Sequence, residues 1–301
     1  MSILNMPSDG LFNVLIVLVR ALVRFGPKSR DELLASCGAN VSSVEPKQLN
    51  QTLNRWMELG LFELEADQVR LNEVHTKALG KKPDVAELKL PGIIRSIALR
   101  PENNLRFWES EGNRSADLNR GLSWILAQDI YTIDTGSHER IQKLENEQIA
   151  DLSKRIFQND TRWNGLRTWM VYLGFGRTGA RMTVDPTVAV RDELPQIFKQ
   201  DTTLPASIFV ERASEIVPVL DRGKYRVEME AVLNPASWAA PSENQISTSL
   251  SRAIQRLDRE GFIATEQRAD SVDGGITLIG SGGRQWRSVT HIRRLPENGD
   301  K

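Results

Sequence analysis

The chain has 301 residues, enough for two or three compact domains of ordinary size. Hydrophobic residues make up 40% of the chain and charged residues 26%, a composition that excludes wholesale disorder. Lys+Arg and Asp+Glu both total 39, so no overall field would hold the protein on nucleic acid or on an anionic membrane. Any such binding must come from a local patch of charge.

Cysteine and histidine are scarce, which limits redox and metal chemistry. Cys37 is the single cysteine and cannot form an intramolecular disulfide, and three histidines are too few for a structural zinc site. A reducing cytosol fits this composition best, so we expect a cytoplasmic protein. The most apolar stretch, residues 11–23, is too short to cross a bilayer and contains Arg20, so no membrane partner is expected. Residues 280–284 lack the Lys-Ser/Thr ending of a phosphate loop, and no cofactor is predicted.

The N-terminal residues predict a winged helix-turn-helix. Apolar residues recur at spacings of three and four through residues 11–25, and Ser29 followed by Glu32 forms a capping-box pattern for a short second helix. Pro46 suits the first position of a third helix, which a glycine would end. Residues 61–71 alternate as two strands around a polar turn. Three helices followed by a hairpin are the order of a winged helix, whose third helix often enters the DNA major groove.

A corner in which a helix turns directly into a strand is predicted three times along the chain. Its glycines are Gly60, Gly174 and Gly261, each between hydrophobic residues. Such a corner requires a left-handed backbone, which glycine adopts most easily. The recurrence indicates tandem winged helices, and whether the middle copy is a true winged helix stays open.

We therefore expect a mainly helical α+β protein with small β-hairpins, built from tandem winged helix-turn-helix units and a helical middle region. The predicted domains are an N-terminal winged-helix domain at 1–74, a helical middle region at 75–200 and a C-terminal winged-helix domain at 201–301.

Two features are predicted within the later domains. Residues 137–157 keep a near-helical apolar rhythm and predict a long amphipathic helix. Ser242 followed by Gln245 is a capping pattern that predicts the start of the third helix of the last domain. The hairpin after that helix is predicted to be long, with glycine-rich turns at 273–275 and 280–283.

Arginines gather near the end of the chain. Three of them are spaced four and three residues apart, which places them on one face of the predicted third helix: Arg252, Arg256 and Arg259. Residues 276–295 contain no acidic residue and four more arginines: Arg284, Arg287, Arg293 and Arg294. These seven side chains are the predicted nucleic-acid-binding residues, acting on backbone phosphates with low sequence specificity.

The alternative interpretation of these arginines is structural. Asp258 and Glu260 lie beside the helical group, and acidic groups elsewhere in the chain could pair with the rest. The seven tryptophans are dispersed, so we expect core and interface anchors rather than a base-stacking platform. Because no nucleophile, base and orienting group can be assembled from named residues, the sequence does not predict an enzyme.

Three segments carry a resemblance to a known family. They are residues 5–11 (NMPSDGL), 52–62 (TLNRWMELGLF) and 117–129 (DLNRGLSWILAQD). They resemble the bacterial DpdG family, and none of them is a catalytic motif. The resemblance implies a role beside helicases, nucleases and ATPases of a gene cluster that places 7-deazaguanine derivatives in DNA and restricts unmodified DNA. It implies the restriction side of that cluster.

Three functions remain open. The first is a non-enzymatic winged-helix subunit of an anti-phage restriction system that engages DNA or acts as an adaptor, with DNA and the other protein subunits as partners. The second is a protein-interaction scaffold, which the net neutrality and the acidic first wing with Glu63, Glu65 and Asp67 favour. The third is a winged-helix transcription regulator, which would need a dimerisation element and a more basic third helix in the first domain.

Overall fold

The structure is a computed structural model that describes residues 3–4, 12–41, 45–109, 114–268 and 275–296. The protein is a mixed α+β chain with small antiparallel sheets, which confirms the predicted class. Within the described ranges, every helix is too short or too polar to span a lipid bilayer. Some residues of the sequence predictions lie outside the described residues. They are the segment 5–11 of the family resemblance, which ends at Leu11, and Asp273 and Gly274 of the predicted glycine-rich turn.

The chain divides into two compact units. One contains residues 1–118 and 161–173, and the other contains residues 119–160 and 174–301. The predicted boundaries at 74 and 200 stay a prediction.

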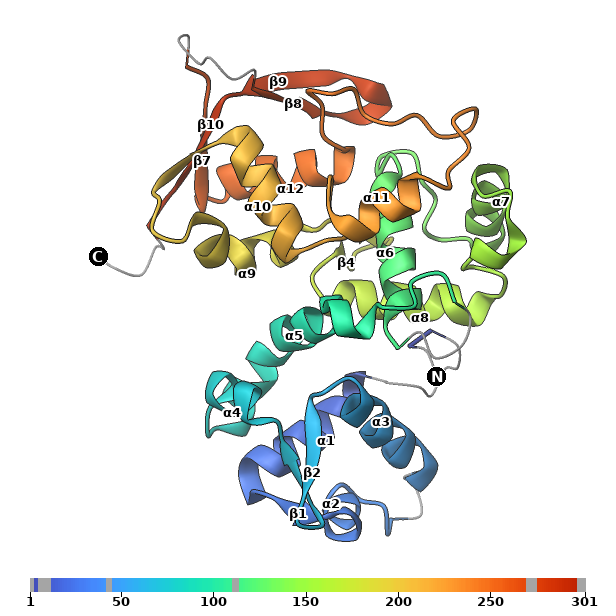
Figure 1. Ribbon diagram of the computed structural model, residues 1–301, viewed down its shortest axis with the longest axis vertical. Helices are drawn as coiled ribbons and strands as arrows, with labels where there is room; N and C mark the ends of the chain where they lie inside the picture. The colour runs from blue at the N-terminus through green and yellow to red at the C-terminus, as the bar shows by residue number, and fades with distance from the viewer. Residues whose placement is uncertain (1–2, 5–11, 42–44, 110–113, 269–274, 297–301) are drawn as a thin grey trace. The chain divides into compact units, whose positions relative to one another are not determined.

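The first unit begins with three helices and a three-stranded antiparallel sheet (Figure 1). These elements are α1 (Phe12–Phe25), β1 (Lys28–Ser29), α2 (Arg30–Ser36), α3 (Pro46–Glu58), β2 (Phe62–Glu65) and β3 (Gln68–Leu71). The strand order in the sheet is β1-β3-β2. Ser29 and Glu32 form the predicted capping box of α2, and Pro46 is the first residue of α3 as predicted.

The first unit is completed by further helices. They are α4 (Glu73–Leu79), α5 (Pro83–Leu99), η1 (Pro101–Asn103) and most of α8 (Asp160–Tyr172). Trp56 of α3 has no exposed surface, and its ring centroid lies 5.8 Å from that of Trp169 in α8. The buried carboxylate of Asp117 accepts the backbone N–H groups of Ile3 and Leu4 at 3.2 and 2.6 Å. The core therefore joins segments that are distant in sequence.

The second unit contains the remaining helices and strands. They are most of α6 (Ala116–Ala127), α7 (His138–Gln148), η2 (Leu152–Lys154), β4 (Gly176–Arg177), β5 (Thr183–Val184), α9 (Thr187–Phe198), β6 (Thr203–Pro205), α10 (Ala206–Ile216), α11 (Lys224–Glu230), α12 (Thr248–Arg259), β7 (Ile263–Glu266), β8 (Ile276–Ile279), η3 (Ser281–Gly283), β9 (Gln285–Val289) and β10 (His291–Arg294).

The strands of the second unit form one sheet and two hairpins (Figure 1). The sheet order is β6-β10-β7, so β7 pairs with β10 rather than with the strand that follows it. The hairpin β8-β9, drawn in red, lies within the connection between β7 and β10. Its turn contains Gly282 and Gly283 in the left-handed region, where the sequence predicts a glycine-rich turn.

The three predicted corner glycines all adopt a left-handed backbone. The φ angles are +89° at Gly60, +82° at Gly174 and +79° at Gly261. In each case a helix is followed within a few residues by a strand, namely α3 by β2, α8 by β4 and α12 by β7. This part of the sequence prediction is confirmed.

Residues 137–157 do not form the single long helix that was predicted. Ile149, directly after α7, is extended, with φ −118° and ψ 106°. The buried carboxylate of Glu145 accepts the backbone N–H groups of Ile156 and of the residue after it at 2.6 and 2.9 Å. These bonds hold the chain back against α7, so the apolar rhythm beyond α7 comes from an irregular segment.

The helix predicted to begin at Ser242 begins at Thr248. The backbone N–H of Gln245 donates to the carbonyl oxygen of Ser242 at 2.8 Å, which is a turn rather than a helix start. Gln245 also forms a parallel bridge with Thr277 of β8. Pairing with this strand holds the segment extended and delays the helix.

Candidate nucleic-acid interface

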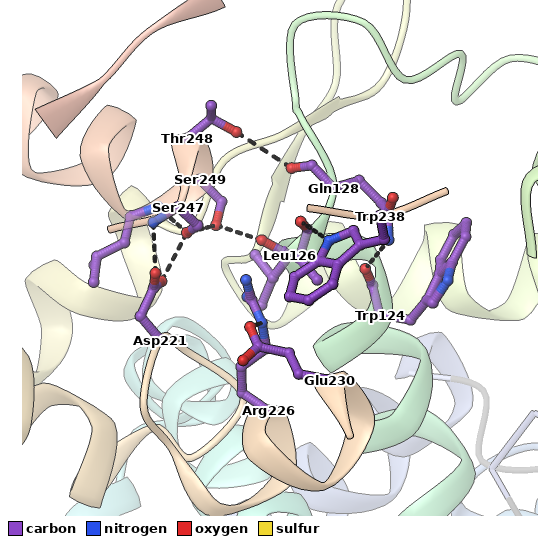
Figure 2. A network of polar contacts seen from close by, with 12 residues as sticks. Trp124, Leu126, Gln128, Asp221, Arg226, Glu230, Trp238, Ser247, Thr248 and Ser249 are labelled. Carbon is purple, nitrogen blue, oxygen red and sulfur yellow. Dashed lines mark hydrogen bonds and ion pairs between the residues drawn. The ribbon is translucent and has the colours of Figure 1, made fainter. Parts of the chain in front are cut away.

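The helix α12 carries three of the seven predicted nucleic-acid-binding arginines. Its N-cap is Ser247, whose hydroxyl accepts the backbone N–H of Leu250. The carboxylate of Asp221 accepts both the N–H and the hydroxyl of Ser247, at 2.5 and 2.7 Å (Figure 2). A buried carboxylate therefore fixes the start of α12.

The first turn of α12 is also covered by the C-terminal end of α6 and the residue that follows it. Ser249 donates its hydroxyl to the carbonyl oxygen of Leu126 at 2.8 Å, and Thr248 donates to that of Gln128 at 3.2 Å (Figure 2). Ser249 has no exposed surface. In a helix-turn-helix the N-terminal residues of the third helix contact base edges. Here that end of α12 lies inside the unit.

Arg252 and Arg256 converge on a buried carboxylate. Asp185 has no exposed side-chain surface, and its Oδ2 lies 3.0 Å from Nη1 of Arg256 and 3.5 Å from Nε of Arg252. Arg177 of β4 approaches the same oxygen at 4.0 Å. The other carboxylate oxygen accepts the backbone N–H of Thr187 at the start of α9. The structure therefore brings two of the predicted residues together as counterions of Asp185.

The other predicted residues differ in how they are paired. Arg287 of β9 bonds to the carboxylate of Asp258 and to the hydroxyl of Thr265, and Arg293 lies 3.1 Å from the carboxylate of Glu266. Arg294 is half-buried and lines a cavity with Phe262 and other residues. Arg259 and Arg284 are exposed, and no ion pair or hydrogen bond joins either side chain to another residue in the described part of the chain.

A groove of about 440 Å³ lies between α12 and the β8-β9 hairpin. Its lining residues are Gln255, Asp258, Arg259, Leu278, Trp286 and Arg287. Two of the predicted arginines thus share one concave surface with an aromatic ring and a carboxylate. The volume falls in the range of small-ligand sites.

Trp286 is the residue of this groove that sequence reasoning missed. The sequence predicts core and interface anchors for the tryptophans, and Trp56 and Trp124 have no exposed surface, whereas Trp286 is 37% exposed. Its ring stands edge-on to that of Tyr131, with 6.3 Å between centroids, and the guanidinium of Arg252 lies 5.8 Å from the Tyr131 centroid. Trp286 lies in a basic stretch of the sequence beside a glycine-rich turn, and this position could have indicated an exposed tryptophan.

A larger cavity of about 670 Å³ lies elsewhere in the second unit. Its lining includes Asp134, Arg140 and Trp238, and none of the seven predicted arginines. Asp134 pairs with Arg140 at 2.7 Å, and Trp238 donates its indole N–H to the carbonyl oxygen of Ala127 at 3.0 Å (Figure 2). The backbone N–H of Gly136 and the charge of Arg140 hold the pKa of Asp134 below its usual value. These polar groups are satisfied by one another and do not point to a ligand.

Two residues with redox or acid-base chemistry, Cys37 and His75, are partly or fully buried. Burial raises the pKa of the Cys37 thiol to about 11, so the thiol stays protonated at neutral pH. Burial, with the charge of Arg100, lowers the pKa of His75. In the part of the chain that the structure describes, no group of three His, Cys, Asp or Glu side chains could hold a metal ion.

A family model described as DpdG-like matches residues 1–271. The chain belongs to the DpdG-like family. The range that matches the family model ends between β7 and β8. One wall of the groove, formed by Leu278, Trp286 and Arg287, therefore lies outside the matched range. No curated protein and no solved structure matches the chain.

Proposed function

We propose that this DpdG-like protein is a non-enzymatic winged-helix subunit that engages DNA in a bacterial anti-phage restriction system linked to 7-deazaguanine modification. Family membership supports the link to the modification system. The observation that carries the DNA-binding role is the groove beside α12, where Arg259, which has no ion-pair partner among the described residues, lies with Arg287 and Trp286. Exposed cations beside an aromatic ring match the phosphates and bases of a nucleic acid.

The order of elements in both units supports the winged-helix interpretation. The first unit runs α1-β1-α2-α3-β2-β3 with sheet order β1-β3-β2. The second unit runs α9-β6-α10-α12-β7-β10 with sheet order β6-β10-β7, and α11 is inserted before α12. In both sheets the last strand lies between the other two. On this alignment α12 is the third helix and the segment between β7 and β10 is the wing, and winged helices contact DNA with these two parts.

DNA binding can be tested by fluorescence anisotropy of labelled DNA across a range of salt concentrations. Neutralising Z phosphates makes log K fall with log salt at a slope of about −0.9Z. We expect salt-dependent binding, and we expect the double variant Arg259→Ala/Arg284→Ala to weaken it and to reduce the slope by about 2. Arg252 and Arg256 are unsuitable for this test because their loss would leave the buried Asp185 with only Arg177, at 4.0 Å, as a counterion.

A matched control removes the same charge from two helices that carry none of the seven predicted arginines. Lys143 of α7 and Lys224 of α11 are exposed and do not line the groove. Lys143→Ala/Lys224→Ala should leave both the affinity and the salt slope near the wild-type values. Absence of DNA binding at low salt would contradict the proposal.

A second candidate is an adaptor that binds a protein subunit through the first unit. The corresponding surface there is not basic. Arg55 of α3 is only 3% exposed and pairs with Glu58 at 3.1 Å, and Arg70 of β3 bonds to Glu63 at 2.6 Å and to Glu65. Replacing Glu63 and Glu65 with lysine should leave DNA affinity unchanged and abolish association with the restriction subunits if the first unit has this role.

A further inference from the structure

We infer that the groove between α12 and β9 binds single-stranded DNA by stacking an unpaired base on Trp286. This inference rests on the proposed DNA-binding function and specifies the form of DNA that the groove takes. Proteins that bind single strands combine exposed aromatic rings, on which bases stack, with cations that follow the backbone. Trp286 supplies the ring and Arg259 supplies a cation, and Arg287, which pairs with Asp258, lines the same groove.

The Trp286 ring lies close to a glycine of the hairpin turn. A Cβ atom at Gly280 would lie 2.9 Å from Nε1 of Trp286, so only glycine allows the indole to lie this close to the backbone of the turn. The edge-on contact with Tyr131 supports the ring from another side. A ring that is fixed before binding loses little conformational entropy when a base stacks on it.

The strand that carries Trp286 is itself open to solvent. The first four residues of β9 are exposed, and its only partner strand among the described residues is β8. The indole keeps 37% of its surface exposed although it belongs to a residue type that folding normally buries. An exposed tryptophan with a fixed ring and two neighbouring arginines is therefore placed for a planar partner.

The same surface is poorly suited to reading a duplex. The bases of a duplex are stacked on each other, and a protein reads their edges by inserting a helix or a β-ribbon into a groove. The N-terminal end of α12, which would enter the major groove, is bonded to Leu126 and Gln128 inside the unit. The accessible part of α12 is its C-terminal half, where Gln255, Asp258 and Arg259 line the groove. An unpaired base can enter such a groove, whereas a stacked base pair cannot.

The test measures the affinity of the full chain for three labelled probes of equal length by fluorescence anisotropy. The probes are a single-stranded DNA, the corresponding duplex and a single strand that carries abasic sites throughout. We expect the protein to bind the single strand more tightly than the duplex and than the abasic strand. Trp286→Ala should weaken binding of the single strand about tenfold or more. It should leave duplex and abasic-strand binding within about twofold of wild type, because neither probe offers a base to the ring.

Trp286→Phe keeps an aromatic face and should retain most of the single-strand affinity, and a thermal melt of each variant checks that the hairpin is folded. The wild-type comparison of intact and abasic strands does not depend on any variant. Equal affinity of the wild-type protein for those two strands would overturn the inference while leaving DNA binding intact. Lack of binding to every probe would instead overturn the proposed function.

Discussion

Asp185 Oδ2 lies 3.0 Å from Nη1 of Arg256, and the Asp185 side chain has no exposed surface. The carboxylate also accepts the backbone N–H of Thr187 through its other oxygen, so a single buried charge joins α12 to the start of α9. This relationship changes the meaning of the arginine pattern in α12. Two of the three arginines on that helix face bind Asp185, and the third, Arg259, is exposed.

We predict that Asp185→Ala lowers the free energy of unfolding by about 3 kcal/mol or more. Removing one partner of a buried ion pair leaves the other without compensation, and here the partly buried guanidinium groups of Arg252 and Arg256 lose the carboxylate of Asp185. The measurement is chemical denaturation of both proteins at neutral pH. Asp201→Ala is the control, because Asp201 pairs with Arg212 at 2.8 Å on the surface and its loss should cost at most about 1 kcal/mol. Equal losses in the two variants would show that Asp185 has no special role.

The thiol of Cys37 provides a prediction about pH. Burial raises its pKa to about 11 from the ordinary thiol value of 9.0, so the folded protein should carry about a hundredfold less thiolate at pH 8 than the unfolded chain. The folded state holds this proton more tightly, so the thiol's contribution to stability is fully present below pH 9 and is lost as the pH rises towards 11.

Alkylation by iodoacetamide measures the thiolate of Cys37 directly. The rate in native buffer should be far below the rate in urea at pH 8, and the two should converge as the pH approaches 11. Cys37→Ser serves as the blank for reaction at other side chains. A native rate equal to the denatured rate at pH 8 would show that the thiol is not buried.

Trp56 should be one of the most sensitive positions of the first unit. It has no exposed surface and packs against the ring of Trp169, so Trp56→Ala creates a large cavity and should cost about 3 to 5 kcal/mol. Val74→Ala, at a side chain that is 72% exposed, should change stability by no more than about 0.5 kcal/mol. Circular dichroism melts of both variants test this, and an unchanged melt for Trp56→Ala would contradict the packing described here.

The sequence was informative where structure depends on neighbouring residues. Apolar spacing identified α1, α3 and α12, and the corner glycines were located because a left-handed backbone is a local requirement. The start of α12 was misplaced because pairing of Gln245 with Thr277 of β8 competes with the capping pattern of Ser242. A residue pattern close in sequence does not reveal a strand that arrives from later in the chain.

For the same reason, the sequence predicted only part of the candidate site. Spacing places Arg252, Arg256 and Arg259 on one helix face, but it cannot reveal that Asp185, 71 residues before Arg256, occupies part of that face. The contact of Trp286 with Tyr131 likewise joins β9 to the loop after α6. Both relationships arise from tertiary packing, which composition and periodicity do not encode.

The last prediction compares two glycines of the second unit that share a left-handed backbone and differ in their surroundings. At Gly261, with φ +79°, a Cβ atom would meet nothing within 4 Å, so Gly261→Ala should cost only the backbone strain of about 1 kcal/mol. At Gly174, with φ +82°, a Cβ atom would lie 3.0 Å from the backbone nitrogen of Ala189 and from Cγ1 of Val188. Gly174→Ala should therefore cost a further ~1 to 3 kcal/mol, because the start of α9 must move. Urea denaturation measures the free energy of unfolding of the two variants. A larger loss of stability in Gly174→Ala supports close packing of this corner on α9. Equal losses would mean that the corner can relax and that backbone strain alone explains the glycine.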